Sequence, residues 1–161
     1  MNGALDKALA LRRSGEFQES NELLADLVRQ FPDDAVVNYQ YAVSLDLLGQ
    51  ERRAVPFYER AIELGLPSDE TQKAIVGLGS SYRALGEYEK SKAVFEKGTA
   101  LFPDNRAIQV FFAMTLYNLQ EHRRAMELLL RCLLDTTGDD AILGYKKAIA
   151  FYAERLDETW D

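Results

Sequence analysis

Residues 72–105 read QKAIVGLGSSYRALGEYEKSKAVFEKGTALFPDN, and this stretch decides the fold. Its apolar side chains recur at helical spacing in two blocks, one before Gly86 and one after it. Pro103 stops the second block because proline has no N–H to continue a helix, and Asp104 or Asn105 is suited to capping the next helix. The stretch therefore predicts two helices joined by a short turn.

The turn between two helical blocks recurs at regular intervals along the chain. Gly15, Gly49 and Gly86 each follow an apolar-periodic stretch, and Gln120 holds the equivalent place in a fourth, so that the spacings are 34, 37 and 34 residues. A fixed period of this size indicates an array of structural repeats. The sequence divides into units at residues 1–34, 35–68, 72–105 and 106–139, with an insertion at 69–71 that predicts an extra helical turn at the start of the third unit.

Small residues recur in phase with this period. The eighth position of the units holds Ala8, Ala42, Gly79 and Ala113, and the twentieth holds Ser20, Ala54, Ser91 and Ala125. Two antiparallel helices approach to about 8–10 Å only where small side chains let their backbones close in. Independent amphipathic helices have no reason to repeat this pattern, so the units are predicted to be helical hairpins that stack on one another.

In these residues the chain resembles the tetratricopeptide repeat family, and the resemblance covers residues 1–139. The third unit carries most of the family motif, with Leu78, Gly79, Tyr82, Gly86, Tyr88, Phe95 and Pro103 at the expected positions. The fourth unit departs from the motif because it lacks the turn glycine. The resemblance implies an all-α fold, a right-handed α-α superhelix of four helix–turn–helix repeats in a single domain over residues 1–161.

Residues 140–158 follow the last unit and carry one apolar seam with a spacing of three and four residues. Lys147 occupies the position that a fifth repeat would need to keep small. The stretch is therefore predicted to be a capping helix that covers the stacking face of the fourth unit. We expect residues 157–161 to fray, with docking of Trp160 into the groove of its own or another chain as an alternative.

Composition excludes several classes of function. The 161 residues are 47% hydrophobic and 28% charged, with a net charge of −7, which disfavours nucleic-acid binding. One cysteine, Cys132, and one histidine, His122, exclude a cysteine-rich or His-paired metal site. No apolar run has the length of a membrane span. We expect a cytoplasmic protein that is not an enzyme, with no cofactor, no metal, no nucleic-acid partner and no membrane partner.

The resemblance also implies a binding surface. In this family the first helix of each repeat lines the concave face, and positions 2, 5, 9, 12 and 13 point into it. Positions 5, 9 and 12 of the four units, with position 2 of the third, assign to this face Leu5, Leu9, Arg12, Tyr39, Val43, Asp46, Lys73, Val76, Ser80, Arg83, Val110, Met114 and Tyr117. At positions 5 and 9 all but Ser80 are apolar, so the Lys, Arg and Asn clamp with which some family members hold acidic chaperone tails is absent.

An apolar groove favours an amphipathic helix or an extended apolar peptide, with Arg12, Lys73 and Arg83 placed to orient acidic groups of the partner. We therefore predict a non-catalytic protein–protein interaction scaffold. Two alternatives remain open at this stage. The same face can form a homodimer with a second copy of the chain, or the protein can be a chaperone for a secreted partner.

Overall fold

The computed structural model describes residues 2–161, which form ten α-helices and no strand. In chain order these are α1 (Asn2–Arg13), α2 (Phe17–Gln30), α3 (Ala35–Leu47), α4 (Glu51–Leu64), α5 (Ser68–Ala84), α6 (Tyr88–Leu101), α7 (Arg106–Asn118), α8 (His122–Thr136), α9 (Asp140–Leu143) and α10 (Lys146–Ala153). None of the helices within these residues has the length and apolar composition needed to cross a membrane.

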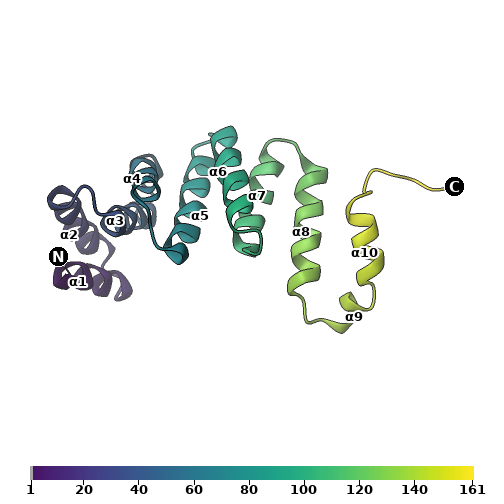
Figure 1. Cartoon of the computed structure of the whole chain (residues 1–161), viewed down its shortest axis with the longest axis horizontal. Helices are drawn as coiled ribbons and strands as arrows, with labels where there is room; N and C mark the ends of the chain where they lie inside the picture. Colours follow the sequence, from purple (N-terminus) through teal and green to yellow (C-terminus); the bar gives the residue numbers. More distant parts are fainter. Residues whose placement is uncertain (1) are drawn as a thin grey trace.

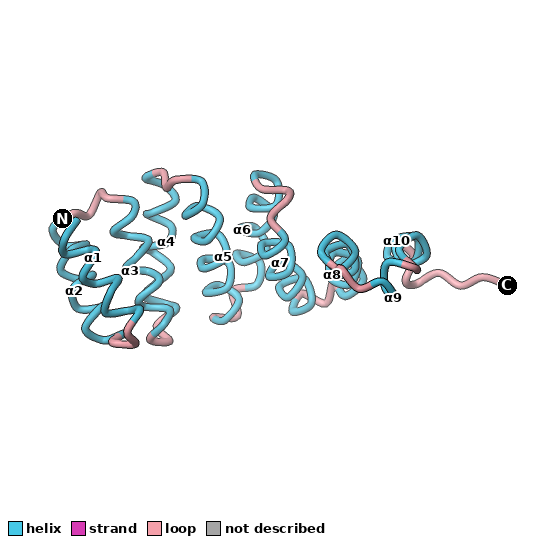
Figure 2. The backbone as a smooth tube through the Cα atoms, turned by 90° about the horizontal axis from the view of Figure 1, so that it is seen from below, coloured by secondary structure: helices cyan, strands magenta, loops and turns pink. Residues whose placement is uncertain are grey.

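The first eight helices pack as four antiparallel pairs that follow one another along the long axis of the molecule (Figures 1 and 2). The second helix of each pair packs on the first helix of the next. The first helices also pack on one another, α3 on α5 and α5 on α7, and so form one continuous inner row. The predicted all-helical solenoid is confirmed, and so is the extra turn of the third unit, since α5 begins at Ser68 and is 17 residues long.

The turn inside each pair has one residue in the left-handed region. Gly15, Gly49 and Gly86 have φ values of 88°, 68° and 75°, and Gln120 has a φ of 62° at the equivalent place in the fourth pair. Glycine adopts this conformation at little cost because it has no Cβ. Among residues 2–161, Gln120 is the one non-glycine residue with a positive φ, so the fourth pair makes the same turn with a less suitable residue.

The small residues at repeat positions 8 and 20 face each other inside the pairs, as predicted. Ala8 and Ser20 are fully buried, and the Ser20 hydroxyl donates a hydrogen bond to the Ala8 carbonyl at 2.8 Å. In the third pair, Ser91 donates to the carbonyl of Gly79 at 2.7 Å in the same way. Serine therefore replaces alanine at position 20 without an unsatisfied polar group, because the first helix supplies the acceptor.

The core divides into two clusters. One extends from α1 to α5, and the other lies among α5, α6, α7 and α8 around the fully buried ring of Phe95. That ring fills the space above Gly79, where an added Cβ would lie 2.4 Å from its Cζ atom. Beyond α8 the only buried side chain of the described chain is that of Ala153, so the C-terminal end adds little to the core.

The prediction of one capping helix over residues 140–158 is wrong. The stretch forms two short helices, α9 and α10, and the second ends at Ala153. At Tyr145 the backbone N–H bonds to Ile142 in a tighter turn, next to Gly144, a residue that weakens helices. The acidic residues after Ala153 oppose the helix dipole at a C-terminus and do not favour a longer helix. α10 packs on α8, and Met126, Leu129 and Leu133 of α8 stay exposed.

Candidate binding surface

The predicted inner-face residues of the first two units are largely covered. Leu5 and Leu9 are partly buried, and Leu5 and Val43 pack against the first core cluster. Tyr39 was expected to point into an open groove, and this expectation is wrong. Its side chain is only 8% exposed, and its ring lies 6.2 Å from that of Tyr58 of α4. Tyr39 therefore belongs to the core, and the groove is shallow at this end.

Arg12 lies on the same part of the inner row. Its Nη2 donates to Gln40 Oε1 of the next first helix at 2.8 Å, whereas its Nη1 is buried without a hydrogen-bond partner among the described residues. Burial of the guanidinium lowers the pKa of Arg12, and electrostatic interaction with the nearby Tyr39 and Tyr58 hydroxyl groups offsets this in part. Arg12 thus links α1 to α3 and is only partly accessible to a partner.

Asp46 is engaged in a network between three helices. Its carboxylate accepts hydrogen bonds from Tyr58 Oη of α4 at 2.7 Å and from Ser81 Oγ of α5 at 3.0 Å. Burial raises the pKa of Asp46, although these two hydrogen bonds act in the opposite direction. Burial also raises the pKa of Tyr58, and the charge of Asp46 raises it further, so Tyr58 stays neutral and able to donate. Asp46 therefore ties the second unit to the third.

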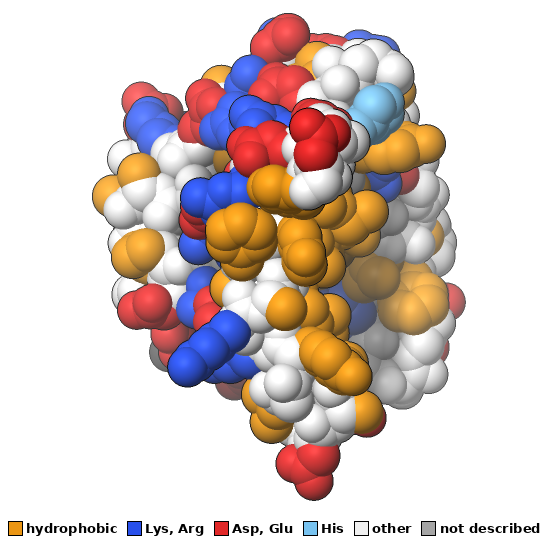
Figure 3. All heavy atoms as spheres, turned by 90° about the vertical axis from the view of Figure 1, so that its right-hand side faces the viewer, with side chains coloured by type: hydrophobic (Ala, Val, Ile, Leu, Met, Phe, Trp, Pro, Cys, Tyr) orange, Lys and Arg blue, Asp and Glu red, His pale blue; other side chains and the backbone are white. Residues whose placement is uncertain are grey.

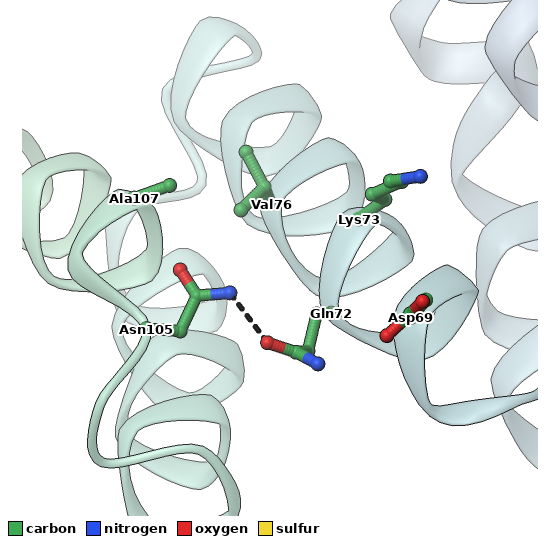
Figure 4. Close-up of a pocket in the computed structure, with 6 residues that line it drawn as sticks. All are labelled: Asp69, Gln72, Lys73, Val76, Asn105 and Ala107. Atoms are coloured by element: carbon green, nitrogen blue, oxygen red, sulfur yellow. Dashed lines mark hydrogen bonds between the residues drawn. The ribbon is translucent and has the colours of Figure 1, made fainter.

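A polar pocket of about 380 Å³ lies between the N-terminal ends of α5 and α7 (Figure 4). It is lined by Asp69, Gln72, Lys73, Val76, Asn105 and Ala107. Across the pocket the Asn105 side chain donates to Gln72 Oε1 at 2.7 Å. Of the predicted residues it contains Lys73, which is exposed, and Val76, which packs against the second core cluster. The pocket offers amide, ammonium and carboxylate groups beside two apolar side chains, those of Val76 and Ala107.

A second pocket of about 450 Å³ opens between α5, α7 and α8, and we call it the inner pocket. It is lined by Arg83, Ala113, Met114, Tyr117, Asn118, His122, Ala125, Met126 and Leu129. Tyr117 is 63% exposed and Met114 39% exposed, so both side chains can be reached from solvent. The inner pocket brings together three of the predicted residues, Arg83, Met114 and Tyr117.

Polar groups lie at the edge of this apolar surface. Arg83 Nη1 donates to Asn118 Oδ1 at 3.2 Å, and Arg83 Nε is buried without a hydrogen-bond partner among residues 2–161. Ser80, one turn earlier on α5, likewise has a buried hydroxyl without a partner in the described chain. Val110, on α7, is partly buried. The inner pocket therefore combines apolar walls with a guanidinium that no described carboxylate neutralises.

The α8 side of the inner pocket was not predicted. Met126 and Leu129 lie on a second helix, and the family pattern assigns the binding surface to first helices only. The sequence nonetheless contains a signal for this surface. Met126, Leu129 and Leu133 recur at spacings of three and four residues and so form a second apolar face of α8, beside the buried one. His122, the first residue of α8, is exposed, and its ring centroid lies 4.9 Å from that of Tyr117.

Cys132 is buried on α8. Its Sγ lies 3.1 Å from Gln109 Oε1, and burial raises the pKa of the thiol. A thiol with a raised pKa is a poor nucleophile because little of it is thiolate near neutral pH. Within residues 2–161, no three His, Cys, Asp or Glu side chains lie close enough together to hold a metal ion.

Solved structures similar to this chain are repeat proteins. MamA (residues 41 to the end) from Desulfovibrio magneticus RS-1 covers 98% of this chain and 97% of its own, at 15% identity and a TM-score of 0.72. YrrB, described as a TPR protein with an unusual peptide-binding site, covers 94% of this chain and 77% of its own, at 14% identity and a TM-score of 0.70. At these identities the likeness concerns the fold.

Sequence comparison leads to the family. The human Protein RRP5 homolog is 29% identical over 105 residues, which are 65% of this chain and 6% of that protein, so the chain spans a small part of this relative. The family model of the tetratrico peptide repeat matches residues 35–156, well over half of the chain. The helical pairs, the in-phase small residues and this match agree, and the chain belongs to the tetratricopeptide repeat family.

Proposed function

We propose that the chain is a non-catalytic scaffold that binds an apolar or amphipathic segment of a partner protein, with the inner pocket as the anchor site. Tetratricopeptide repeat proteins are protein-interaction scaffolds, which gives the general class of function. The observation that carries the finer assignment is the inner pocket, where exposed Met114 and Tyr117 stand beside Met126 and Leu129. Methionine-rich surfaces suit such binding because the flexible thioether adapts to the shape of the partner.

The size of the inner pocket fits one or two apolar side chains of a partner. Covering one large apolar side chain contributes about 1.5–3 kcal/mol before the cost of association is subtracted. Two such anchors, presented one turn apart on a helix or two residues apart on an extended segment, contribute about 3–6 kcal/mol. Micromolar binding corresponds to about 8 kcal/mol, so contacts outside the inner pocket must supply the rest and offset the cost of association.

The charge beside the inner pocket favours an acidic group next to the apolar anchors. Arg83 lines the pocket, and no described carboxylate forms an ion pair with it. A guanidinium can hold a carboxylate with two parallel hydrogen bonds, and such a pair fixes orientation more than it adds affinity. Lys73, exposed in the neighbouring polar pocket, extends the basic side of the surface.

A random-peptide phage library selected on the immobilised chain tests this proposal. We expect enriched peptides that share apolar residues at a spacing of three, four or two, with an acidic residue beside them. Synthetic versions should bind in fluorescence anisotropy, and Tyr117→Asp combined with Met126→Asp should weaken binding by at least about a hundredfold.

The matched control is Leu101→Asp. Leu101 is as exposed as Tyr117, at 63%, but it lies at the end of α6 and does not line the inner pocket. Circular dichroism should show that all variants remain folded. Equal loss of binding in the control, or unchanged binding in the inner-pocket double variant, contradicts the assignment. A selection with no enriched consensus contradicts peptide binding itself.

A further inference from the structure

The C-terminal end of the molecule carries a cluster of aromatic side chains that the fold leaves uncovered. Tyr145, Phe151, Tyr152 and Trp160 are 70%, 47%, 50% and 56% exposed. The Trp160 ring lies 5.9 Å from the Phe151 ring and 5.6 Å from that of Tyr152, and the Arg155 guanidinium stands 4.4 Å over Phe151. Figure 3 looks onto this end and shows hydrophobic side chains gathered through the middle of the face, with charged side chains around them.

The exposed area of this cluster lies at the upper end of the range found for the largest apolar patch of a monomer. With about 200 Å² for a whole aromatic side chain and a similar area for a leucine, the four aromatics together with Leu143 and Leu156 expose about 600 Å². The largest apolar patch of a typical monomer is about 300–600 Å². Two copies that covered each other here would bury about 1,200 Å² of apolar surface, the lower limit for a specific stable interface.

The charges along α10 point to the identity of the occupant. Lys146 and Lys147 are exposed in the first turn of α10, where a positive charge opposes the helix dipole, and neither forms an ion pair with a described carboxylate. Glu158 and Asp161 follow the other end of the same helix. The helix is thus basic at one end and acidic beyond the other, a pattern complementary to itself in the antiparallel direction.

We propose that the C-terminal end is a self-association surface on which two copies of the chain pair through antiparallel α10 helices. A two-fold axis across the middle of α10 brings Tyr145 of one copy to Tyr152 and Trp160 of the other. Exposed Ala148 lies at the middle of this face and lets the two helices approach closely. The same symmetry sets Lys146 and Lys147 against the acidic tail of the second copy twice per dimer.

This surface lies beside α8 and differs from the inner pocket, so the dimer goes beyond the proposed peptide binding and leaves that site open. Arg155 and the aromatic side chains around it are residue types that contribute most to interface affinity. The tail segment was predicted to fray, but Trp160 packs on Phe151 and Tyr152 within one copy. In the dimer its acidic groups would gain Lys146 and Lys147 of the second copy.

Sedimentation equilibrium of the full 161-residue chain between about 1 and 200 μM tests the proposal. We expect a monomer–dimer equilibrium whose dissociation constant rises by at least about a hundredfold in Phe151→Asp with Tyr152→Asp. Tyr117→Asp in the inner pocket is the matched control, because Tyr117 is at least as exposed and its change should leave the constant within about threefold. A monomer at every concentration, or a dimer that Tyr117→Asp breaks and the α10 variant does not, overturns the proposal.

Charge reversal tests the antiparallel arrangement separately. Lys146→Glu with Lys147→Glu should weaken the dimer by about tenfold at low salt, and the loss should shrink at high salt. Adding Glu158→Lys and Asp161→Lys to the same chain should restore dimerisation, because each reversed end then meets a reversed partner. A dimer that the lysine reversal leaves unchanged, or that the second pair of changes does not restore, overturns the antiparallel pairing.

Discussion

The second and fourth helical pairs are built on the same repeat pattern, yet one has a closed inner surface and the other an open one. Tyr39 on α3 is 8% exposed, whereas Tyr117 on α7 is 63% exposed. At the repeat position of Tyr117 the second pair has Asp46, which is held by hydrogen bonds from α4 and α5. α3 is followed by another first helix that packs on it, whereas after α7 the chain continues to α10, which packs on α8. Accessibility is therefore set by the neighbouring helix as much as by the motif position.

The largest expected effect comes from truncating these two tyrosines. Tyr39→Ala should lower the free energy of unfolding by about 3–5 kcal/mol because it opens a cavity beside Tyr58. Tyr117→Ala should change it by about 0.5 kcal/mol or less, since the side chain is mostly in water. Urea denaturation followed by circular dichroism measures both changes. Similar losses of stability in the two variants would contradict the distinction between a closed second pair and an open fourth pair.

The protonation of Asp46 is expected to have a smaller effect on the free energy of unfolding, and this effect depends on pH. Because burial raises the pKa of Asp46, the folded chain holds this proton more tightly than the unfolded chain. Its contribution to stability is therefore greatest below the unfolded pKa of about 3.9 and falls as the pH rises through the raised folded value. The stability of the wild type relative to Asp46→Asn should decline over this acidic range and then level off.

The measurement is the difference in unfolding free energy between the wild type and Asp46→Asn at each pH, because the contributions of the other carboxylates cancel in this difference. Ser81→Ala is a useful companion variant, since it removes a hydrogen bond that lowers the pKa of Asp46 and should move the decline to higher pH. A difference that rises with pH would mean that the hydrogen bonds from Tyr58 and Ser81 outweigh burial.

The smallest expected change in stability concerns the turn of the fourth pair, which has Gln120 where the other pairs have glycine. Gln120→Gly should raise the free energy of unfolding by about 1 kcal/mol, because φ is 62° and only glycine adopts this region freely. The exchange gives up the exposed hydrogen bond between Gln120 and His122, which contributes little in water. Gly86→Gln is the reciprocal variant and should lower stability by a similar amount. A destabilising Gln120→Gly would show that the side-chain contact matters more than the backbone.

The helices and their pairing could be predicted from the sequence because they depend on local signals. The turn residues, the prolines and the in-phase small residues Ala8, Ser20, Gly79 and Ser91 act within one unit or between neighbouring helices. The candidate site could be predicted only in part. Arg83, Met114 and Tyr117 meet in the inner pocket, whereas Met126 and Leu129 were missed because they lie on a second helix and the family pattern assigns the binding surface to first helices.

The sequence by itself determined that this chain is a stack of helical hairpins, because each unit contains the apolar periodicity and the small residues that specify a hairpin. Only the tertiary structure decided which side chains of that stack remain in contact with water. Tyr39 is covered and Tyr117 is open because burial depends on where the next helix packs, and after the break near Gly144 the helix α10 packs on α8. That placement is a balance of contacts between distant residues, and no single repeat contains the information that fixes it.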